Sequence, residues 1–87
     1  MHFVYVLQSK KDHKLYYGLT KDLRKRLDQH NKGLVSSTKT RLPIELIYFE
    51  EATNLSAARS KERYFKSGFG RKYIKGKIKQ KALSSIG

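Results

Sequence analysis

Hydrophobic residues form three short runs along the chain, and polar or turn-forming residues bound each run. Residues 3–7 are an uninterrupted β-branched and aromatic run, which is typical of a strand covered on both faces at the centre of a sheet. A polar stretch at 9–14 separates this run from residues 15–19, so the two predict an antiparallel hairpin. Residues 44–50 predict a third strand, ended by a turn at 51–54.

Side chains alternate between the two faces of the second predicted strand. Leu15, Tyr17 and Leu19 share one face, and Tyr16 shares the other with Gly18. Because Gly18 has no side chain, this face leaves room for whatever approaches it.

Capping residues bracket a first helix after the hairpin. Thr20 is a suitable N-cap, Asp22 suits the positive first turn, and Gly33 stands where a left-handed helix stop is needed. These signals predict a helix from about residue 21 to 31. Leu23 and Leu27 mark its buried stripe.

The second half of the chain predicts two more helical segments. Asn54 or Ser56 would cap a helix over about 55–66, residues 67–70 break the chain, and a basic helical segment runs from about residue 70. Residues 35–42 lack any period and predict a basic, hydroxyl-rich loop or a short irregular helix. We therefore expect residues 1–87 to form a single α/β domain, with a central three-stranded antiparallel sheet flanked by helices.

Charge and composition narrow the class of partner. Twenty Lys and Arg against seven Asp and Glu give a formal charge of +13, a field that attracts polyanions and favours nucleic acid as partner. An anionic membrane is a weaker alternative, since no segment combines a wide apolar face with a basic one. Without a secretory signal or a long apolar run, we expect a cytoplasmic protein.

The absence of cysteine excludes disulfides, thiolate zinc sites and cysteine nucleophiles. No phosphate-binding Walker loop or dinucleotide glycine fingerprint is present, which disfavours a nucleotide cofactor. A metal bound by a carboxylate or a histidine remains possible on these grounds.

Glu62 is the most informative candidate. Helical spacing groups it with Leu55, Ala58 and Phe65 on the face expected to turn toward the sheet, where an unpaired carboxylate costs several kcal/mol. One interpretation is an ion pair within a helical turn, to Arg59 or Lys66. The other is a ligand for Mg²⁺, which binds through one carboxylate and keeps much of its hydration shell.

Arg26 lies beside the buried stripe of the first predicted helix, with His30 one turn further on. Its guanidinium is expected to reach the sheet edge, where it could hold a phosphate bidentately or simply extend into solvent. His30 could relay a proton, bind phosphate or cap the helix end.

Two of the six tyrosines stand out by position. Tyr5 and Tyr16 lie on the two strands of the hairpin, so their hydroxyls could converge at one site. A phenol has a pKa near 10 and serves as a base only where cations stabilise the phenolate. Arg26, Lys21 or a metal would supply such cations.

The order of these residues resembles the GIY-YIG nuclease superfamily, in particular its small stand-alone bacterial members. Residues 4–6, Val-Tyr-Val, look like the first signature, and residues 16–18, Tyr-Tyr-Gly, look like the second, with Tyr17 in place of the middle aliphatic residue. Arg26 follows Gly18 by eight residues, as the family arginine does, and Glu62 fits the glutamate of the last core helix. Phe3 replaces the glycine of the first signature, and Leu19 stands where repair nucleases of the family carry a lysine.

The resemblance implies a metal-dependent endonuclease that hydrolyses phosphodiester bonds in DNA by in-line attack of an activated water. Tyr16 would be the general base and Tyr5 would orient the water or the phosphate. Arg26 would stabilise the pentacovalent phosphate, with His30 as a further catalytic candidate, and Glu62 would hold Mg²⁺ or Mn²⁺. Structure-selective cleavage is expected rather than sequence-specific cleavage. The alternative is a nucleic-acid-binding module, for DNA or RNA, that keeps the fold without useful turnover.

Basic residues outside this centre are expected to contact the phosphate backbone and to add affinity that weakens with salt. The candidates are Lys21, Lys39, Arg41, Arg71, Lys72 and Lys75.

Overall fold

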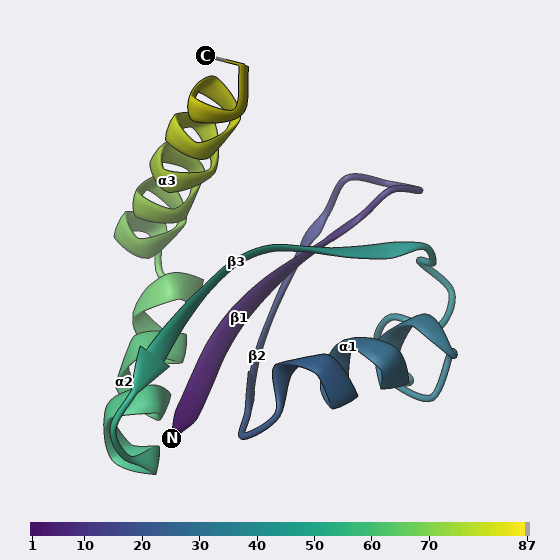
Figure 1. Ribbon diagram of the computed structural model, residues 1–87, viewed down its shortest axis with the longest axis horizontal. Coiled ribbons are helices and arrows are strands. Elements are labelled where there is room, and N and C mark those ends of the chain that lie inside the picture. Colours follow the sequence, from purple (N-terminus) through teal and green to yellow (C-terminus); the bar gives the residue numbers. More distant parts are fainter. Residues whose placement is uncertain (87) are drawn as a thin grey trace.

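The computed structural model describes residues 1–86, with side chains described for residues 1–77. Figure 1 shows a sheet between two helical layers, with α1 on one face and α2 followed by α3 on the other. The helical and strand elements, in chain order, are β1 (His2–Ser9), β2 (Leu15–Thr20), α1 (Leu23–Asn31), β3 (Ile44–Ala52), α2 (Leu55–Lys66) and α3 (Gly68–Ile86).

The sheet has the strand order β2-β1-β3, and β1 pairs antiparallel with both neighbours. The predicted hairpin and the central place of the first strand are therefore confirmed. Tyr5 lies opposite Gly18, and Leu7 lies opposite Tyr16. The third strand runs on to Ala52, two residues into the turn that was predicted to end it.

Each face of the sheet carries its own apolar cluster. Val4 and Val6 pack with Ala58 and Phe65 of α2 and with Ile74 of α3. On the other face the cluster consists of buried Tyr5, Leu7 and Ile44, and Leu23 and Leu27 of α1 pack against it. The uninterrupted apolar run of β1 is thus explained, because both of its faces are covered.

The first helix begins two residues later than predicted. Asp22 is the N-cap, and its carboxylate accepts a hydrogen bond from the Lys25 amide at 3.1 Å. Thr20 instead exchanges hydrogen bonds with the Asp22 backbone. Both residue types cap helices well, and here the carboxylate also meets the positive end of the dipole. The stop at Gly33 is as predicted, with φ +75°.

The break between the last two helices is shorter than the four residues predicted. Asn54 caps α2 through a bond from the Ala57 amide at 2.8 Å. Only Ser67 leaves the helical conformation, and α3 starts at Gly68. Gly70 lies so close to the backbone at Tyr64 that a Cβ would overlap its carbonyl. Glycine therefore serves close packing of the two helices here.

A carboxylate fastens α3 to the sheet. Glu50 of β3 accepts hydrogen bonds from Tyr48, from Lys61 of α2 at 2.8 Å, and from Tyr73 of α3 at 3.1 Å. Burial by itself would raise the pKa of Glu50, but these donors outweigh it and the net shift is downward. Glu50 is therefore an ionised joint between three elements.

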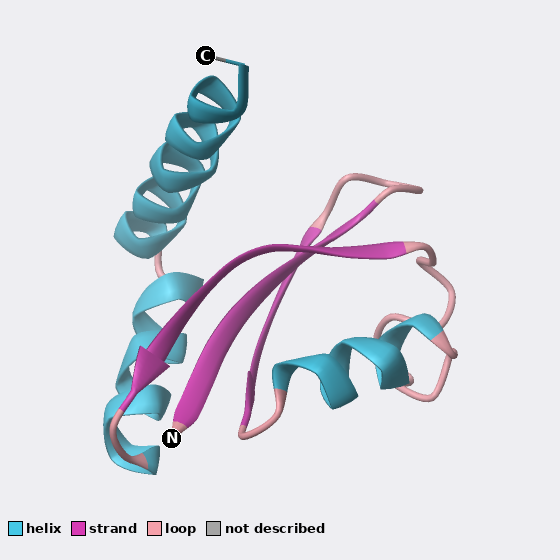
Figure 2. Ribbon diagram, in the orientation of Figure 1, coloured by secondary structure: helices cyan, strands magenta, loops and turns pink. Residues whose placement is uncertain are grey.

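A loop of successive turns connects α1 to β3, and it curls beside the C-terminal end of α1 (Figure 2). Asn31 accepts a hydrogen bond from the Ile44 amide at 3.1 Å, which ties the end of α1 to the start of β3. The predicted loop character of residues 35–42 is confirmed, and Thr38 within it is fully buried. None of the helices in residues 1–86 is long and apolar enough to cross a membrane.

Candidate active site

A cleft of about 590 Å³ follows the outer edge of β2. Residues 15–19 of this strand form its floor, and because their side chains alternate, the cleft opens toward both helical layers. The lining residues contributed by the other elements are Tyr5, Arg26, His30, Val35, Ser37, Glu62, Lys66 and Arg71.

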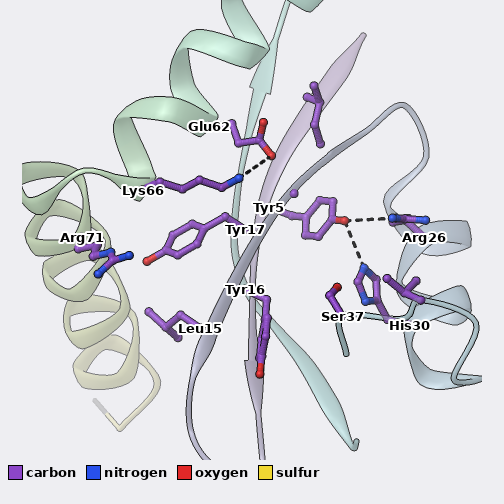
Figure 3. A pocket seen from close by; sticks show the side chains of 13 residues that line it. Tyr5, Leu15, Tyr16, Tyr17, Arg26, His30, Ser37, Glu62, Lys66 and Arg71 are labelled. Atoms are coloured by element: carbon purple, nitrogen blue, oxygen red, sulfur yellow. Dashed lines mark hydrogen bonds and ion pairs between the residues drawn. The ribbon is translucent and has the colours of Figure 1, made fainter. Parts of the chain in front are cut away.

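Tyr5 is the buried centre of a hydrogen-bonded chain at this cleft. Arg26 donates from Nε to the Tyr5 hydroxyl oxygen at 3.3 Å, and the same hydroxyl lies 3.2 Å from His30 Nε2. His30 Nδ1 lies 2.7 Å from the hydroxyl of Thr38. Figure 3 shows the Tyr5 hydroxyl directed toward both α1 side chains. The predicted approach of Arg26 to the sheet is confirmed.

The surroundings of His30 favour its neutral form. Burial lowers the pKa of its imidazole, and the nearby charge of Arg26 lowers it further. With Arg26 donating to the Tyr5 oxygen, the phenol proton is free to point at Nε2, and Nδ1–H then donates to Thr38. His30 Nε2 then accepts the hydrogen bond that the Tyr5 hydroxyl donates. Both ring nitrogens are occupied, so direct phosphate binding by His30 is disfavoured.

Gly18 is required by the path of the Tyr5 side chain. The two residues face each other across β1 and β2, and a Cβ on Gly18 would overlap the Cζ and hydroxyl oxygen of Tyr5. The space expected beside Tyr16 is therefore filled by Tyr5 itself. A glycine in the second signature lets the tyrosine of the first signature cross to α1.

Tyr16 lines the same cleft, but its hydroxyl does not meet that of Tyr5. The two rings lie on one face of the sheet and two residues apart in register. In Figure 3 the Tyr5 hydroxyl points toward α1, whereas the Tyr16 hydroxyl points along the sheet away from it. Both phenols therefore line one cleft, but their hydroxyls point in different directions, because each side chain follows its own strand position.

Glu62 lies across β2 from the hydrogen-bonded chain, on the α2 side of the cleft. Its side chain is 25% exposed, and Oε2 lies 3.5 Å from Lys66 Nζ. Of the two ion pairs considered, the one to Lys66 is present. Exposed pairs with this spacing contribute about 0.3–0.5 kcal/mol, so Lys66 leaves the carboxylate accessible to a competing cation.

The six predicted phosphate-binding residues divide by position. Arg71 lines the main cleft and Lys75 lines a smaller one beside it, while Lys21 lines a third at the start of α1. Lys39, Arg41 and Lys72 line none of these clefts. Arg41 is paired with Asp12 at 3.3 Å, so its charge is partly engaged within the fold.

Two residues that line the cleft, Tyr17 and Lys66, and one behind it, Thr38, escaped the sequence analysis. Strand alternation correctly placed Tyr17 on one face with Leu15 and Leu19, but gave it no role at the cleft. Lys66 was considered only as a partner for Glu62. Thr38 had no signal at all, because a loop without a period gives no indication of which side chain turns inward.

Comparison with known proteins decides the family. The GIY-YIG catalytic domain matches residues 1–75. The chain belongs to the GIY-YIG family. GIY-YIG is a nuclease family, and the class of substrate that it implies is nucleic acid. The three-stranded antiparallel sheet with its helices confirms the predicted fold class.

Bacterial relatives of this GIY-YIG domain are small UPF0213 proteins. One from Lactococcus lactis subsp. cremoris is 46% identical over 91 residues, covering 98% of this chain and 92% of the relative. One from Clostridium perfringens is 43% identical over 67 residues, covering 76% and 71%. The protein YazA of Bacillus subtilis is 44% identical over 66 residues, covering 75% and 66%. No solved structure gives a significant match.

Proposed function

We propose that this GIY-YIG domain is a metal-dependent endonuclease that hydrolyses phosphodiester bonds in DNA. The observation that carries the proposal is the single cleft along β2, which gathers Tyr5, Tyr16, Arg26 and Glu62 from four elements. A module that only binds nucleic acid has no need of a carboxylate in such a cleft. An enzyme that must position a water and a phosphate for hydrolysis does need one.

The residues of the cleft suit a divalent cation that needs only one carboxylate ligand from the protein. Glu62 is the one carboxylate among the lining residues, and within residues 1–86 no group of three acidic or histidine side chains could enclose a metal. Mg²⁺ accepts such a site, since it keeps several waters and takes substrate phosphate oxygens as further ligands. Glu62 would hold Mg²⁺ or Mn²⁺, with Lys66 displaced. The cation would withdraw negative charge from the phosphate.

The protein's own side chains would bind the phosphate and accept the proton of the attacking water. Arg26 holds a non-bridging oxygen of the scissile phosphate, since its guanidinium offers donors beyond the one bound to Tyr5. A water oxygen attacks the phosphorus in line and passes a proton to a phenolate, while the P–O bond to the leaving oxygen breaks. The leaving oxygen departs as an alkoxide and takes a proton from solvent water. The positive charge of the Arg26 guanidinium would stabilise the pentacovalent phosphate.

The base is one of the two tyrosines. Resemblance to the family assigns this role to Tyr16, with Tyr5 orienting the water or the phosphate. The hydrogen bonds favour Tyr5, because Arg26 donates to its oxygen and would stabilise a phenolate there. Replacement of each phenol separately distinguishes these two assignments.

Structure-selective cleavage fits the charge of the surface. Six basic side chains would bind backbone phosphates without contacting the bases, namely Lys21, Lys39, Arg41, Arg71, Lys72 and Lys75. Nothing in the short loops resembles an element that could read base edges over a long site. The cytoplasmic setting stays a prediction from the sequence.

Cleavage of labelled single-stranded, duplex and branched DNA, and of RNA, tests the proposal. We expect cutting of a DNA substrate in Mg²⁺ or Mn²⁺ and none in EDTA. Glu62→Gln should reduce the rate at least about 100-fold, and so should Phe at the tyrosine that acts as base. The other Tyr→Phe variant should retain more activity.

Matched controls separate chemistry from folding. Tyr64→Phe changes an exposed tyrosine, and Glu51→Gln changes an exposed glutamate, so both should cut like the parent. If no substrate is cut while binding persists in every protein, the binding-module alternative replaces the nuclease.

A further inference from the structure

A second, smaller cleft of about 340 Å³ adjoins the main one at the hairpin end of β2. It is lined by His13, Lys14, Leu15, Tyr17, Arg71 and Lys75, and we call it the flanking cavity. Three of these residues, Leu15, Tyr17 and Arg71, also line the main cleft. The two spaces therefore share a wall.

The flanking cavity is strongly basic. Arg71 and Lys75 lie one turn apart on α3, so they point to the same side of the helix, and Lys14 faces them from the hairpin turn. No acidic side chain lines the cavity, and none of the chain's acidic side chains, all of which are described, pairs with these three bases. Asp12, the nearest acid along the chain, is engaged by Arg41.

Tyr17 stands where the two spaces meet. Its ring packs against the apolar cluster on the α2 face, and Figure 3 shows its hydroxyl directed toward the Arg71 guanidinium. Burial raises the pKa of the Tyr17 phenol, with Arg71 opposing the shift, so the hydroxyl stays a proton donor. A tyrosine here, in place of the aliphatic residue of the signature, adds a donor beside three cations.

The opposite end of β2 is less suited to an anion. The cleft there contains Lys21, Lys25 and Arg26, but also Asp22, whose carboxylate caps α1. Three cations beside one carboxylate make that cleft less positive than the flanking cavity. A chain of phosphates leaving the main cleft therefore meets the stronger positive field on the α3 side.

We propose that the flanking cavity is a second phosphate-binding site, in which Tyr17, Lys14, Arg71 and Lys75 hold the backbone phosphate next to the scissile one. The ligand is a nucleic-acid strand that runs along β2 from one cleft into the other. The proposal rests on the proposed function for its register relative to cleavage, but the binding of phosphate stands independently of catalysis.

Salt dependence of binding in EDTA tests the site without any cleavage. The affinity of the full chain for a labelled DNA oligonucleotide is measured between 50 and 300 mM NaCl. Each phosphate contact contributes about 0.7 to the slope of log affinity against log salt for a single strand and about 0.9 for a duplex. Because three cations share one phosphate, Lys75→Gln should reduce the slope by part of that amount, and Arg71→Gln/Lys75→Gln should reduce it further, up to the full amount for one contact.

Lys77→Gln is the matched control, because it removes the same charge from the same helix. Lys77 lies over the ring of Tyr73, at 5.5 Å from its centroid, and lines no part of the flanking cavity. Its slope should equal that of the parent. Tyr17→Phe should weaken binding about tenfold with an unchanged slope, since a neutral hydroxyl displaces no counterion.

Equal slopes for Lys75→Gln and Lys77→Gln, or an unchanged affinity in Tyr17→Phe, would overturn the second site. That failure is distinguishable from failure of the nuclease. If cleavage depends on Glu62 but Lys75→Gln and Lys77→Gln have equal salt slopes, the protein is a nuclease without the second phosphate site. If their slopes differ but no substrate is cut, the second site exists in a protein that only binds nucleic acid.

Discussion

At the scale of single residues, the candidate site depends on one tyrosine crossing one glycine. Tyr5 reaches Arg26 and His30 only because Gly18, opposite it, leaves the space above its Cα empty. The two sequence signatures are therefore parts of one device, in which the second makes room for the first.

Gly18→Ala is expected to disable cleavage while leaving the fold intact. The added methyl group displaces the Tyr5 phenol from Arg26 and His30, and a misplacement of about 1 Å can cost 100-fold in rate. Overpacking of this kind costs about 1–3 kcal/mol of stability. Single-turnover cleavage and urea unfolding measure the two effects.

Gly76→Ala provides the control for that substitution. Gly76 lies inside α3, and a Cβ there meets nothing within 4 Å, so alanine should stabilise the helix by about 0.5–1 kcal/mol. Parental cleavage by Gly18→Ala would show that the position of Tyr5 is irrelevant to the reaction.

At the scale of elements, α3 forms one wall of both clefts, and its attachment to the sheet sets their shape. Glu50 joins β3, α2 and α3 through Tyr48, Lys61 and Tyr73. Burial raises the pKa of Tyr48, and its hydrogen bond to Glu50 raises it further, so this phenol remains a donor. The wall is held by charge and hydrogen bonds as well as by apolar contacts.

Loss of the Glu50 charge should destabilise the protein and change its response to acid. Because the folded-state pKa of Glu50 is below its usual value of 4.5, the ionised joint stabilises the fold fully above about pH 4.5. This contribution is lost as the pH falls through the folded-state pKa. Glu50→Gln should cost about 1–3 kcal/mol at pH 7 and should flatten the acid limb in urea unfolding between pH 7 and 3.

Glu51→Gln serves as the neighbouring control, since this side chain is exposed on the same strand. Its unfolding free energy should follow that of the parent at every pH. An acid limb equally steep in Glu50→Gln and in the parent would exclude Glu50 as the titrating joint.

Sequence periodicity predicted the helices and strands correctly but placed some of their ends wrongly. Strand alternation placed Tyr16 and Gly18 on one face, and helical spacing brought Arg26 and Glu62 toward the sheet. The cap at Asp22 was assigned to Thr20, because both residue types satisfy the same amide donors. Gly68 and Gly70 signalled a break but begin a helix, since the close packing at Gly70 is a tertiary contact that local propensity does not encode.

Contacts across the site were predictable only where a strand or helix imposed them. Arg26 reached the sheet as expected, because its place beside the buried stripe of α1 fixes its direction. The burial of Thr38 behind His30 depends on a loop closing over the helix end, and the meeting of Tyr17 with Arg71 depends on the angle of α3. Neither follows from the order of residues.

At the scale of the whole molecule, charge is unevenly distributed. Three of the seven acidic residues, Glu45, Glu50 and Glu51, lie on β3 at one edge of the sheet, while the opposite edge, β2, borders the basic clefts. A polyanion is therefore drawn more strongly to the β2 edge than to the β3 edge. The same excess charge also opposes folding through self-repulsion.

Salt should therefore stabilise the free protein even as it weakens binding. Raising NaCl from 10 to 150 mM shortens the screening length from about 30 to about 8 Å, and a gain of 1 kcal/mol raises Tm by about 4–8 °C in a domain of this size. We expect Tm to rise by several degrees, as measured by circular dichroism.

Heparin, a polyanion without a scissile phosphodiester, should produce a similar rise at 10 mM NaCl by binding the folded state. Its effect should vanish at high salt. A Tm that is constant with NaCl would show that the three ion pairs found among residues 1–77 already balance the repulsion.

The place of β2 at the edge of the sheet has a consequence for how the protein behaves in solution. An edge strand offers unpaired amides and carbonyls to any strand of another molecule, and here that open edge borders the substrate cleft. Addition of a foreign strand and entry of a nucleic acid compete for the same side of β2. A bound polyanion would thus act as a shield against aggregation, and the basic residues that recruit it also keep neighbouring copies apart when it is gone.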